Sequence, residues 1–439
     1  MRRLAILPLG FLLGCTGPSE RAATPEPRPN IILIMADDLG FETLGLYGGE
    51  SYETPHLDRM AEVGMRFENC YSTPLCTPSR VQIMTGQYNH RNYIAFGMLR
   101  PGETTFAHLV RDAGYAVGIT GKWQLYGNPG QRELSAPAVG SFPTEAGFDE
   151  YHLWQVDEGP WEARYKDPRI TITGQEPQVF EGDYGPDRYT AFALDFIERH
   201  QDEPFLLYYP MCLTHDPFQP TPDDGKAYAA LDPGERLNDP EWFGGYVSYM
   251  DRLVGRIVGK VDELGLGEET LILFTGDNGT DTKVTSRWRG QEVRGRKGHP
   301  VEFGTHVPLL ARWPGTIPAG SLDSGLVDFT DFLPTLVEVA GAPVPDGLPL
   351  DGQSFLHRLK GDPGPQREWV FGHYAPLWGN FADARYVHDT EWKLHEDGRV
   401  FNIKTDPREE TPLDEAGLPP DVRERLRTFR DVLASKKVS

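Results

Sequence analysis

The sequence predicts an α/β protein with a large, mostly parallel β-sheet that has helices on both faces, followed by a small C-terminal antiparallel sheet with a helix. Apolar runs alternate with amphipathic helical stretches along most of the chain, as in parallel α/β sheets. Two runs, residues 30–40 (NIILIMADDLG) and 270–279 (TLILFTGDNG), are almost continuously apolar and end in acidic or amide residues. This pattern is typical of strands buried on both faces whose carboxyl ends open on a site.

The other predicted elements follow in chain order. Residues 54–64 (TPHLDRMAEVG) predict a helix with Thr54 as its N-cap and Pro55 at its first position. Residues 242–264 carry an apolar stripe at helical spacing, which predicts a core helix. Short strand-like runs such as EWVFGHY and EWKLHE replace the alternation after about residue 365. We therefore predict a catalytic domain over residues 30–364 and a C-terminal subdomain over residues 365–439.

The charge of the chain limits its partners. The 439 residues include 43 Lys and Arg against 65 Asp and Glu, a formal net charge of -22. Such a charge repels polyanions at long range and argues strongly against nonspecific nucleic-acid binding. An anionic substrate must therefore be held by local positive charge.

The N-terminus has the order of an export signal. Residues 1–15 (MRRLAILPLGFLLGC) contain two arginines, a short apolar core and a small residue before Cys15. The stretch is too short to span a membrane as a helix. The LLGC spacing resembles a bacterial lipoprotein box, which predicts a lipid anchor at Cys15, a tether over residues 16–29 and a periplasmic or outer-membrane location. The alternative is an ordinary signal peptide whose cleavage site contains a cysteine.

Three cysteines follow the signal. Cys70 and Cys212 either form a disulfide, which export permits, or remain buried free thiols. Cys76 differs from both, because it stands in a proline-containing turn that leads into a helix.

Hard oxygen donors follow the two most apolar strands. Asp37 and Asp38 end the first run, and Asp277 and Asn278 end the second. A doubly wound sheet brings such strand ends together, and this donor set suits Ca²⁺ or Mg²⁺ far better than zinc. The alternative is that each pair only caps a turn.

Residues 76–80 (CTPSR) match the C-x-P-x-R sequence of type I sulfatases, a family of the alkaline-phosphatase superfamily in which a separate enzyme oxidises the cysteine to formylglycine. The resemblance covers nearly the whole mature chain in the family's order. ADDLG and TGDNG resemble its metal motifs, and GKWQL (121–125), THDPF (214–218), GRKGHPVEFGTHVPLLARWPG (295–315) and FNIKTDPREE (401–410) resemble its other segments.

The resemblance implies a sulfatase, with a role for each matching residue. The implied metal is Ca²⁺, with Mg²⁺ less favoured, and the implied partner in maturation is a formylglycine-generating enzyme. The implied catalytic residues are Cys76 as formylglycine, Arg80, Lys122, His215 as the acid for the leaving alcohol, and Lys297. The implied metal ligands are Asp37, Asp38, Cys76, Asp277 and Asn278, and the implied substrate-binding residues are Lys122, Lys297 and His299.

One position departs from the family pattern. Gln124 stands where the family motif often has histidine, and an amide cannot act as a base near neutral pH. The base that helps to expel sulfate is therefore open, with His299 and Asp38 as candidates.

The basic stretch over residues 283–299 suggests a polyanionic substrate. It contains six lysines and arginines and lies at the predicted site edge of an acidic protein, with Trp288 available to stack on a sugar. We therefore expect a sulfated carbohydrate as substrate. A formylglycine-dependent phosphonate monoester or phosphodiester hydrolase, and a lipoprotein that binds glycans without turnover, are the alternatives. Loops near residues 126–186 and 221–240 are expected to select the sugar and the sulfate position.

Overall fold

A computed structural model describes residues 28–127, 131–132, 139–156, 163–232 and 237–436. The predicted signal with Cys15, and residues 16–27 of the predicted tether, lie outside the described residues. Within these ranges, no helix is long and apolar enough to cross a membrane.

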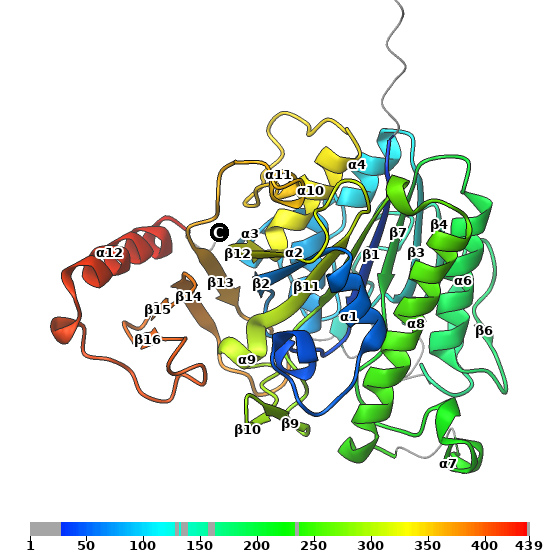
Figure 1. Cartoon of the computed structure of the whole chain (residues 1–439), viewed down its shortest axis with the longest axis horizontal. Helices are drawn as coiled ribbons and strands as arrows, with labels where there is room; N and C mark the ends of the chain where they lie inside the picture. The colour runs from blue at the N-terminus through cyan, green and yellow to red at the C-terminus, as the bar shows by residue number, and fades with distance from the viewer. Residues whose placement is uncertain (1–27, 128–130, 133–138, 157–162, 233–236, 437–439) are drawn as a thin grey trace, which may run out of the picture.

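The main sheet has ten strands in the order β12, β2, β11, β8, β1, β7, β3, β4, β5, β6 (Figure 1). β1 pairs in parallel with β7 and β8, and β3 pairs in parallel with β7 and β4. β11 runs antiparallel to both β2 and β8, and β5 and β6 form an antiparallel edge. The predicted mostly parallel sheet is confirmed. The strands are β1 (Asn30–Ala36), β2 (Met65–Tyr71), β3 (Ala116–Lys122), β4 (Glu150–Trp154), β5 (Arg169–Ile172), β6 (Gln178–Val179), β7 (Phe205–Pro210), β8 (Thr270–Gly276), β11 (His306–Arg312) and β12 (Ser321–Asp328).

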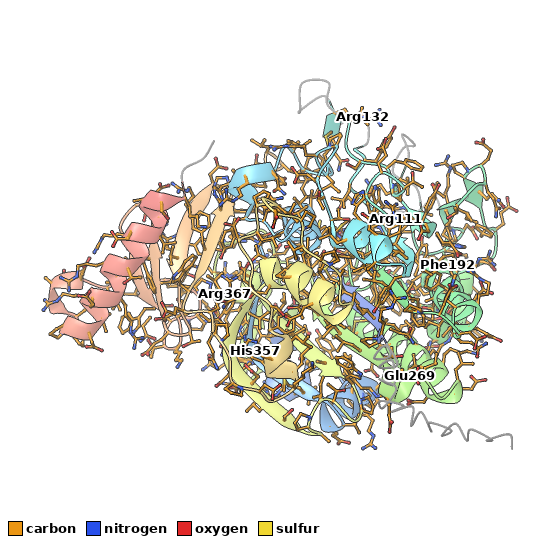
Figure 2. The ribbon with its side chains drawn as sticks, turned by 90° about the horizontal axis from the view of Figure 1, so that it is seen from above. Arg111, Arg132, Phe192, Glu269, His357 and Arg367 are labelled. Carbon is orange, nitrogen blue, oxygen red and sulfur yellow. The ribbon has the colours of Figure 1, made fainter. Side chains whose placement is uncertain are left out.

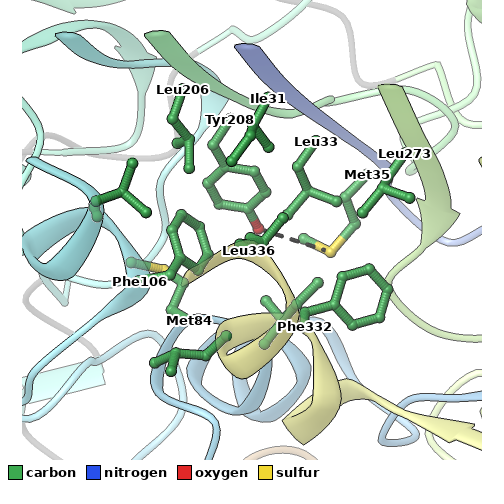
Figure 3. Packing of buried hydrophobic residues seen from close by; sticks show 14 of the residues in the cluster. Ile31, Leu33, Met35, Met84, Phe106, Leu206, Tyr208, Leu273, Phe332 and Leu336 are labelled. Carbon is green, nitrogen blue, oxygen red and sulfur yellow. Dashed lines mark hydrogen bonds between the residues drawn. The ribbon is translucent and has the colours of Figure 1, made fainter. Parts of the chain in front are cut away.

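Helices cover both faces, and β1 shows why. Because side chains of a strand alternate between faces, Ile31, Leu33 and Met35 join one core cluster while Ile32 and Ile34 join the other. Helices α2 (Cys76–Thr85), α4 (Phe106–Asp112) and α10 (Phe332–Val339) cover the first face, whose packing Figure 3 shows. Helices α1 (Pro55–Glu62), α6 (Gly185–Arg199) and α8 (Phe243–Glu263) cover the second.

Two of these helices were predicted from the sequence. The core helix predicted over residues 242–264 is confirmed as α8. The helix that begins at Pro55 is also present, but the Thr54 side chain does not cap it. Asp251 of α8 does so instead, because its carboxylate accepts hydrogen bonds from the backbone N–H groups of His56 (3.1 Å) and Leu57 (2.8 Å). A tertiary contact thus replaces the predicted local cap.

A smaller unit follows the main sheet. Strands β13 (Val370–Tyr374), β14 (Ala384–His388), β15 (Trp392–His395) and β16 (Val400–Asn402) form an antiparallel sheet, and α12 (Pro420–Ser435) packs on it (Figure 1). This confirms the predicted C-terminal sheet with its helix. Arg367 lies at the junction with the larger unit (Figure 2), where its Nε donates to Asp331 Oδ2 (2.9 Å) and its Nη1 to the Tyr88 hydroxyl (2.8 Å).

Other short elements lie in the connecting loops. They include α3 (Asn89–Asn92), α7 (Lys226–Ala230), α9 (Glu302–Thr305), α11 (Leu356–Leu359) and a hairpin of β9 (Thr285–Trp288) and β10 (Gln291–Arg294).

The two structural cysteines are free thiols. Cys70 belongs to the core cluster on one face of the sheet, and Cys212 belongs to the cluster on the other. The disulfide alternative is therefore wrong, because the sheet separates the two side chains.

Candidate active site

The strand directions bring the predicted site residues to one edge of the sheet. β1, β3, β7 and β8 run parallel, so the segments that follow them emerge together: Asp37 after β1, Lys122 at the end of β3 and Asp277 after β8. The antiparallel β11 begins at this same edge, so the segment before it, with Lys297, also reaches the site. His215 follows β7.

Four buried oxygen-bearing side chains form the centre of the site. Asp37, Asp38, Asp277 and Asn278 are each fully buried. Among the described residues, Asp37 Oδ1 and Asn278 Oδ1 have no hydrogen-bond partner. Ligand atoms of Asp37, Cys76 and Asp277 lie within 4.8 Å of one another. Buried acceptors without donors, in a set of hard oxygens, fit a bound Ca²⁺ or Mg²⁺.

The carboxylates perturb one another. Burial and the charge of Asp37 raise the pKa of Asp277 to about 8. Burial alone would also raise the pKa of Asp37, but Lys122, His215 and Arg80 together hold it well below its usual range. Like charges so close together are costly in a buried site, and a divalent cation would relieve this repulsion.

Helix α2 presents Cys76 at its first residue. All ten residues of α2 are buried, and Cys76 itself is 1% exposed. The turn before the helix is fixed by Ser79, whose hydroxyl lies 2.7 Å from the Thr73 hydroxyl. The Cys76 thiol donates to Gln124 Oε1 (3.1 Å), and burial raises the pKa of this thiol. Gln124 thus contacts residue 76 directly, at the position where the family motif often has histidine.

Two cations pair with the metal-site carboxylates from inside the fold. Lys122 Nζ donates to Asp37 Oδ2 (2.7 Å), and Arg80 Nη2 donates to Asp277 Oδ2 (3.0 Å). Both side chains are 1% exposed or less. A surface location for Lys122 is therefore excluded, and both cations lie against the groups that would hold the metal.

Lys297 and His215 close the site on its more open side, where each side chain is 14% exposed. Lys297 Nζ donates to Asp38 Oδ2 (2.5 Å) and lies 3.0 Å from His215 Nε2. Because a charged lysine can only donate, Nε2 accepts there, which leaves the Nδ1 proton of His215 for the Asp216 backbone carbonyl (2.5 Å), with Asp216 Oδ1 also near at 3.0 Å.

Asp216 is a site residue that the sequence analysis missed. Lys283 Nζ (2.8 Å) and Asn238 Nδ2 (2.9 Å) both donate to its Oδ2. Burial alone would raise the pKa of Asp216, but His215, Lys297 and Lys283 lower it. Its position next to His215 in the THDPF segment was the available signal, although adjacency alone does not show that two side chains meet.

His299 and two cations of the basic stretch, Lys283 and Arg287, are exposed, unlike the residues at the centre of the site. His299 is exposed, with Nδ1 3.1 Å from the Lys297 carbonyl oxygen and its ring edge-on to Phe381. Lys283 pairs with Asp216, and Arg287 Nε lies 3.5 Å from Glu50.

The Trp288 ring, which we expected to stack on a sugar, is half-buried and makes several contacts within the protein. Its Nε1 donates to the Tyr47 carbonyl (2.9 Å), and its ring packs edge-on against Phe41 and Phe303. The guanidinium of Arg289 lies over the same ring, 4.7 Å from its centroid. The indole therefore holds the β9–β10 hairpin to the core.

The chain was compared with known proteins. A family model described as "Sulfatase" matches residues 29–342, and one described as "N-sulphoglucosamine sulphohydrolase, C-terminal" matches residues 299–428. Human arylsulfatase A is 32% identical, over 92% of this chain and 87% of the relative. N-acetylgalactosamine-6-sulfatase of Canis lupus familiaris is also 32% identical, over 77% of this chain and 67% of the relative.

A solved structure shares the fold. The structure of BT4656 in complex with its substrate, D-glucosamine-2-N,6-O-disulfate, superposes with a TM-score of 0.76 at 23% identity and covers 93% of this chain and 98% of that one.

An alkaline-phosphatase-like sheet with buried carboxylates, two lysines and an arginine at one edge defines a hydrolase of anionic esters. The chain belongs to the sulfatase family. Like its relatives, it is a sulfuric ester hydrolase.

Proposed function

We propose that this sulfatase hydrolyses sulfate esters of a carbohydrate, using Ca²⁺ and a formylglycine made from Cys76. The observation that carries the proposal is the meeting of Cys76, the Asp37 and Asp277 carboxylates and Lys122 at one buried point. No single one of these residues would be diagnostic. Their convergence at the carboxyl ends of parallel strands supports a catalytic centre.

The proposed metal site uses the buried oxygen donors. Asp37, Asp38, Asp277 and Asn278, together with residue 76, would hold Ca²⁺, which would supply positive charge against the sulfate oxygens. Lys122 and Lys297 would bind the same sulfate, because their ammonium groups already face this centre. Such fixed charges are usually the largest contribution to catalysis of this kind.

Residue 76 would supply the nucleophile. The hydrated aldehyde of formylglycine offers two hydroxyls on one carbon, one to attack sulfur and one whose deprotonation releases sulfate. Gln124 would orient these hydroxyls by hydrogen bonds, as it orients the thiol. The base that removes this proton would be Asp38, because it lies inside the cluster whereas His299 is exposed. We assign His299 instead to contact with the substrate.

His215 would protonate the leaving alcohol. It is reachable at the more open side of the site, and Asp216 fixes its Nδ1 proton so that Nε2 points at the centre. A histidine held in this way can act as a general acid when it is protonated.

A carbohydrate substrate is supported by the printed activities of the relatives, an N-acetylgalactosamine-6-sulfatase among them. The same comparisons favour a sulfatase over a phosphonate monoester or phosphodiester hydrolase and over a glycan-binding lipoprotein. We further propose an exported protein anchored to a bacterial membrane through Cys15, with a catalytic domain over residues 30–364 and a C-terminal subdomain over residues 365–439.

The test is mass spectrometry of the tryptic peptide that contains Cys76, from protein made beside a formylglycine-generating enzyme. We expect the mass loss of thiol-to-aldehyde conversion, together with turnover of sulfated sugars above that of a matched phosphodiester. Because α2 is wholly buried, conversion is expected only before folding, so folded protein treated afterwards should keep its thiol. A thiol that persists even when the two proteins are made together would overturn the formylglycine proposal.

A further inference from the structure

The C-terminal subdomain contributes side chains to the surroundings of Cys76. Leu75, Cys76, Phe96 and Tyr374 form one small buried cluster, against which Trp378 and Phe381 pack. Tyr374 is the last residue of β13, and the connection to β14 follows it. Residues 374–381, here called the aromatic segment, therefore reach the start of α2 from almost 300 residues further along the chain.

The aromatic segment is held on two sides of the site. On one side, the Tyr93 hydroxyl donates to the Pro376 carbonyl (2.8 Å), and the Trp378 ring stacks on Phe96 with centroids 4.9 Å apart. On the other side, Phe381 packs so closely on Gly298 that an added Cβ there would lie 2.1 Å from its ring. Gly298 directly follows Lys297, so the segment lies between the two loops that flank the site.

The Tyr374 hydroxyl is left without a partner. The side chain is 1% exposed, and among the described residues no group hydrogen-bonds to its oxygen. Burial raises the pKa of this hydroxyl, and Cys76 and Lys297 are both near enough to influence it. A buried hydroxyl without a partner is destabilising, so this donor is available to a group from outside the chain.

The chemistry of the surroundings indicates which part of a substrate this partner is. The sulfate already has Lys122, Lys297 and the proposed metal for its charge. Tyr374 instead offers a neutral donor among Leu75, Phe96 and Trp378. An uncharged ring with hydroxyls on its edge and an apolar face matches these side chains better than a second anion does.

We propose that the aromatic segment is the subsite for the sugar ring that bears the sulfate. The Tyr374 hydroxyl donates a hydrogen bond to an oxygen of that ring, and Trp378 lies against its apolar face. This inference rests on the proposed sulfatase function and assigns ring recognition to the C-terminal subdomain.

The test compares the Tyr374→Phe variant of the converted full-length enzyme with wild type on two substrates. These are N-acetylgalactosamine 6-sulfate and 4-nitrophenyl sulfate, which lacks ring hydroxyls. We expect kcat/KM for the sugar to fall about tenfold, and for the aryl ester less than about twofold, because one hydrogen bond to the sugar is lost. Inhibition by inorganic sulfate should be unchanged. The melting temperature should not fall, since the hydroxyl has no partner to lose.

Two further variants sharpen the test. Trp378→Ala should raise KM for the sugar and leave inhibition by sulfate unchanged. Tyr115→Phe is the matched control, because its hydroxyl donates to Pro29 (3.0 Å) beside the opposite end of β3 from Lys122. It should leave both substrates unaffected.

Equal losses of kcat/KM on both substrates, or weaker inhibition by sulfate, would show that Tyr374 contacts the sulfate and not the ring. Either result would overturn the proposal. Unchanged kinetics in Tyr374→Phe would overturn it as well.

If wild type hydrolyses no sulfated sugar, the proposed function fails by itself. Calorimetric binding of N-acetylgalactosamine 6-sulfate then tests the inference about Tyr374. Equal affinity of wild type and Tyr374→Phe would overturn it, and weaker binding by the variant would support it.

Discussion

Three cations and three carboxylates balance at the centre of the site. Lys122 faces Asp37, Arg80 faces Asp277 and Lys297 faces Asp38. With all three carboxylates charged, these six groups sum to a net charge near zero. A bound Ca²⁺ would make it positive by two charges, which suits an anionic ester in a protein whose net charge is -22. The metal would thus set the sign of the net charge of the site as well as its geometry.

Calcium binding should release a proton. Asp277 has a pKa raised to about 8 in the metal-free protein, so it is mostly protonated at neutral pH, whereas Ca²⁺ binds the carboxylate form. We expect affinity to rise with pH up to this pKa and to level off above it, by up to about tenfold per pH unit. Calorimetry in two buffers of different ionisation enthalpy measures the protons released. Binding with no proton release at pH 7 would contradict the prediction, and Asp277→Asn is the control that cannot release this proton.

His215 should matter most for poor leaving groups. Replacing His215 by Gln removes the proposed acid, and we expect kcat for a sugar sulfate to fall by about 10²–10⁴. An aryl sulfate with an acidic phenol needs little protonation and should lose far less. Rates for a series of aryl sulfates of rising phenol pKa measure this, since the variant should show the steeper dependence. Equal losses across the series would remove His215 as the acid.

At the level of elements, the two loops that carry the metal ligands are tied to each other. Gly40, after β1, donates its N–H to the Thr280 hydroxyl (3.2 Å), and that hydroxyl donates to Glu42 Oε1 (2.6 Å). Thr280 follows β8 by four residues. The short helix η1 (Phe41–Thr43) thus fixes the spacing of Asp38 and Asn278.

Glu42 forms this link, but burying its charged carboxylate lowers the free energy of unfolding. Burial raises its pKa to about 7, from about 4.5 in the unfolded chain, so the folded protein binds the extra proton between these values. Stability from this group is therefore full below about pH 4.5 and is lost as the pH rises to about 7.

The Glu42→Gln variant should remove this dependence. In the presence of EDTA at pH 8, we expect it to be more stable than wild type by roughly 2–3 kcal/mol, with the difference vanishing near pH 4.5. Urea unfolding at both pH values is the measurement. A variant less stable than wild type at pH 8 would show that the Glu42 carboxylate is needed in its charged form.

At the level of the whole molecule, the small C-terminal sheet and its helix are joined to the larger unit by buried charges. Arg367 binds Asp331, Tyr88 and Thr330, and Lys393 pairs with Glu409 while donating to the Pro300 carbonyl. Pro300 lies three residues after Lys297, so this junction supports the site loop as well as the fold. The small sheet thus contacts the loop that carries Lys297.

Removing Arg367 should destabilise the protein strongly. Arg367→Ala leaves Asp331, whose side chain is 2% exposed, without its cation, and we expect a loss of about 3–5 kcal/mol. The matched control is Arg427→Ala, whose pair with Glu424 is exposed on both sides and should contribute less than about 1 kcal/mol. Urea unfolding of both variants measures the difference. Similar small losses in both would mean that the junction tolerates an unpaired Asp331.

Much of this arrangement follows from local sequence. Apolar runs that end in Asp37 and Asp277 predicted buried parallel strands with a site at their ends, because local hydrophobicity reports strand burial and the alternation with helices favours parallel strands. The helical stripe over residues 242–264 predicted α8 for the same reason. The motif around Cys76 indicated the family, since its residue types and order are specific.

Contacts between distant segments needed the tertiary structure. Asp251 caps α1 in place of Thr54, Asp216 orients His215 through its contacts with Lys283 and Asn238, and Tyr374 reaches Cys76 from the C-terminal sheet. No periodicity marks such residues, because their partners are set by how helices and sheets pack. The sequence by itself thus determined the fold class and the residue types of the centre. Only packing decided which of them meet, and which side chains line the site around them.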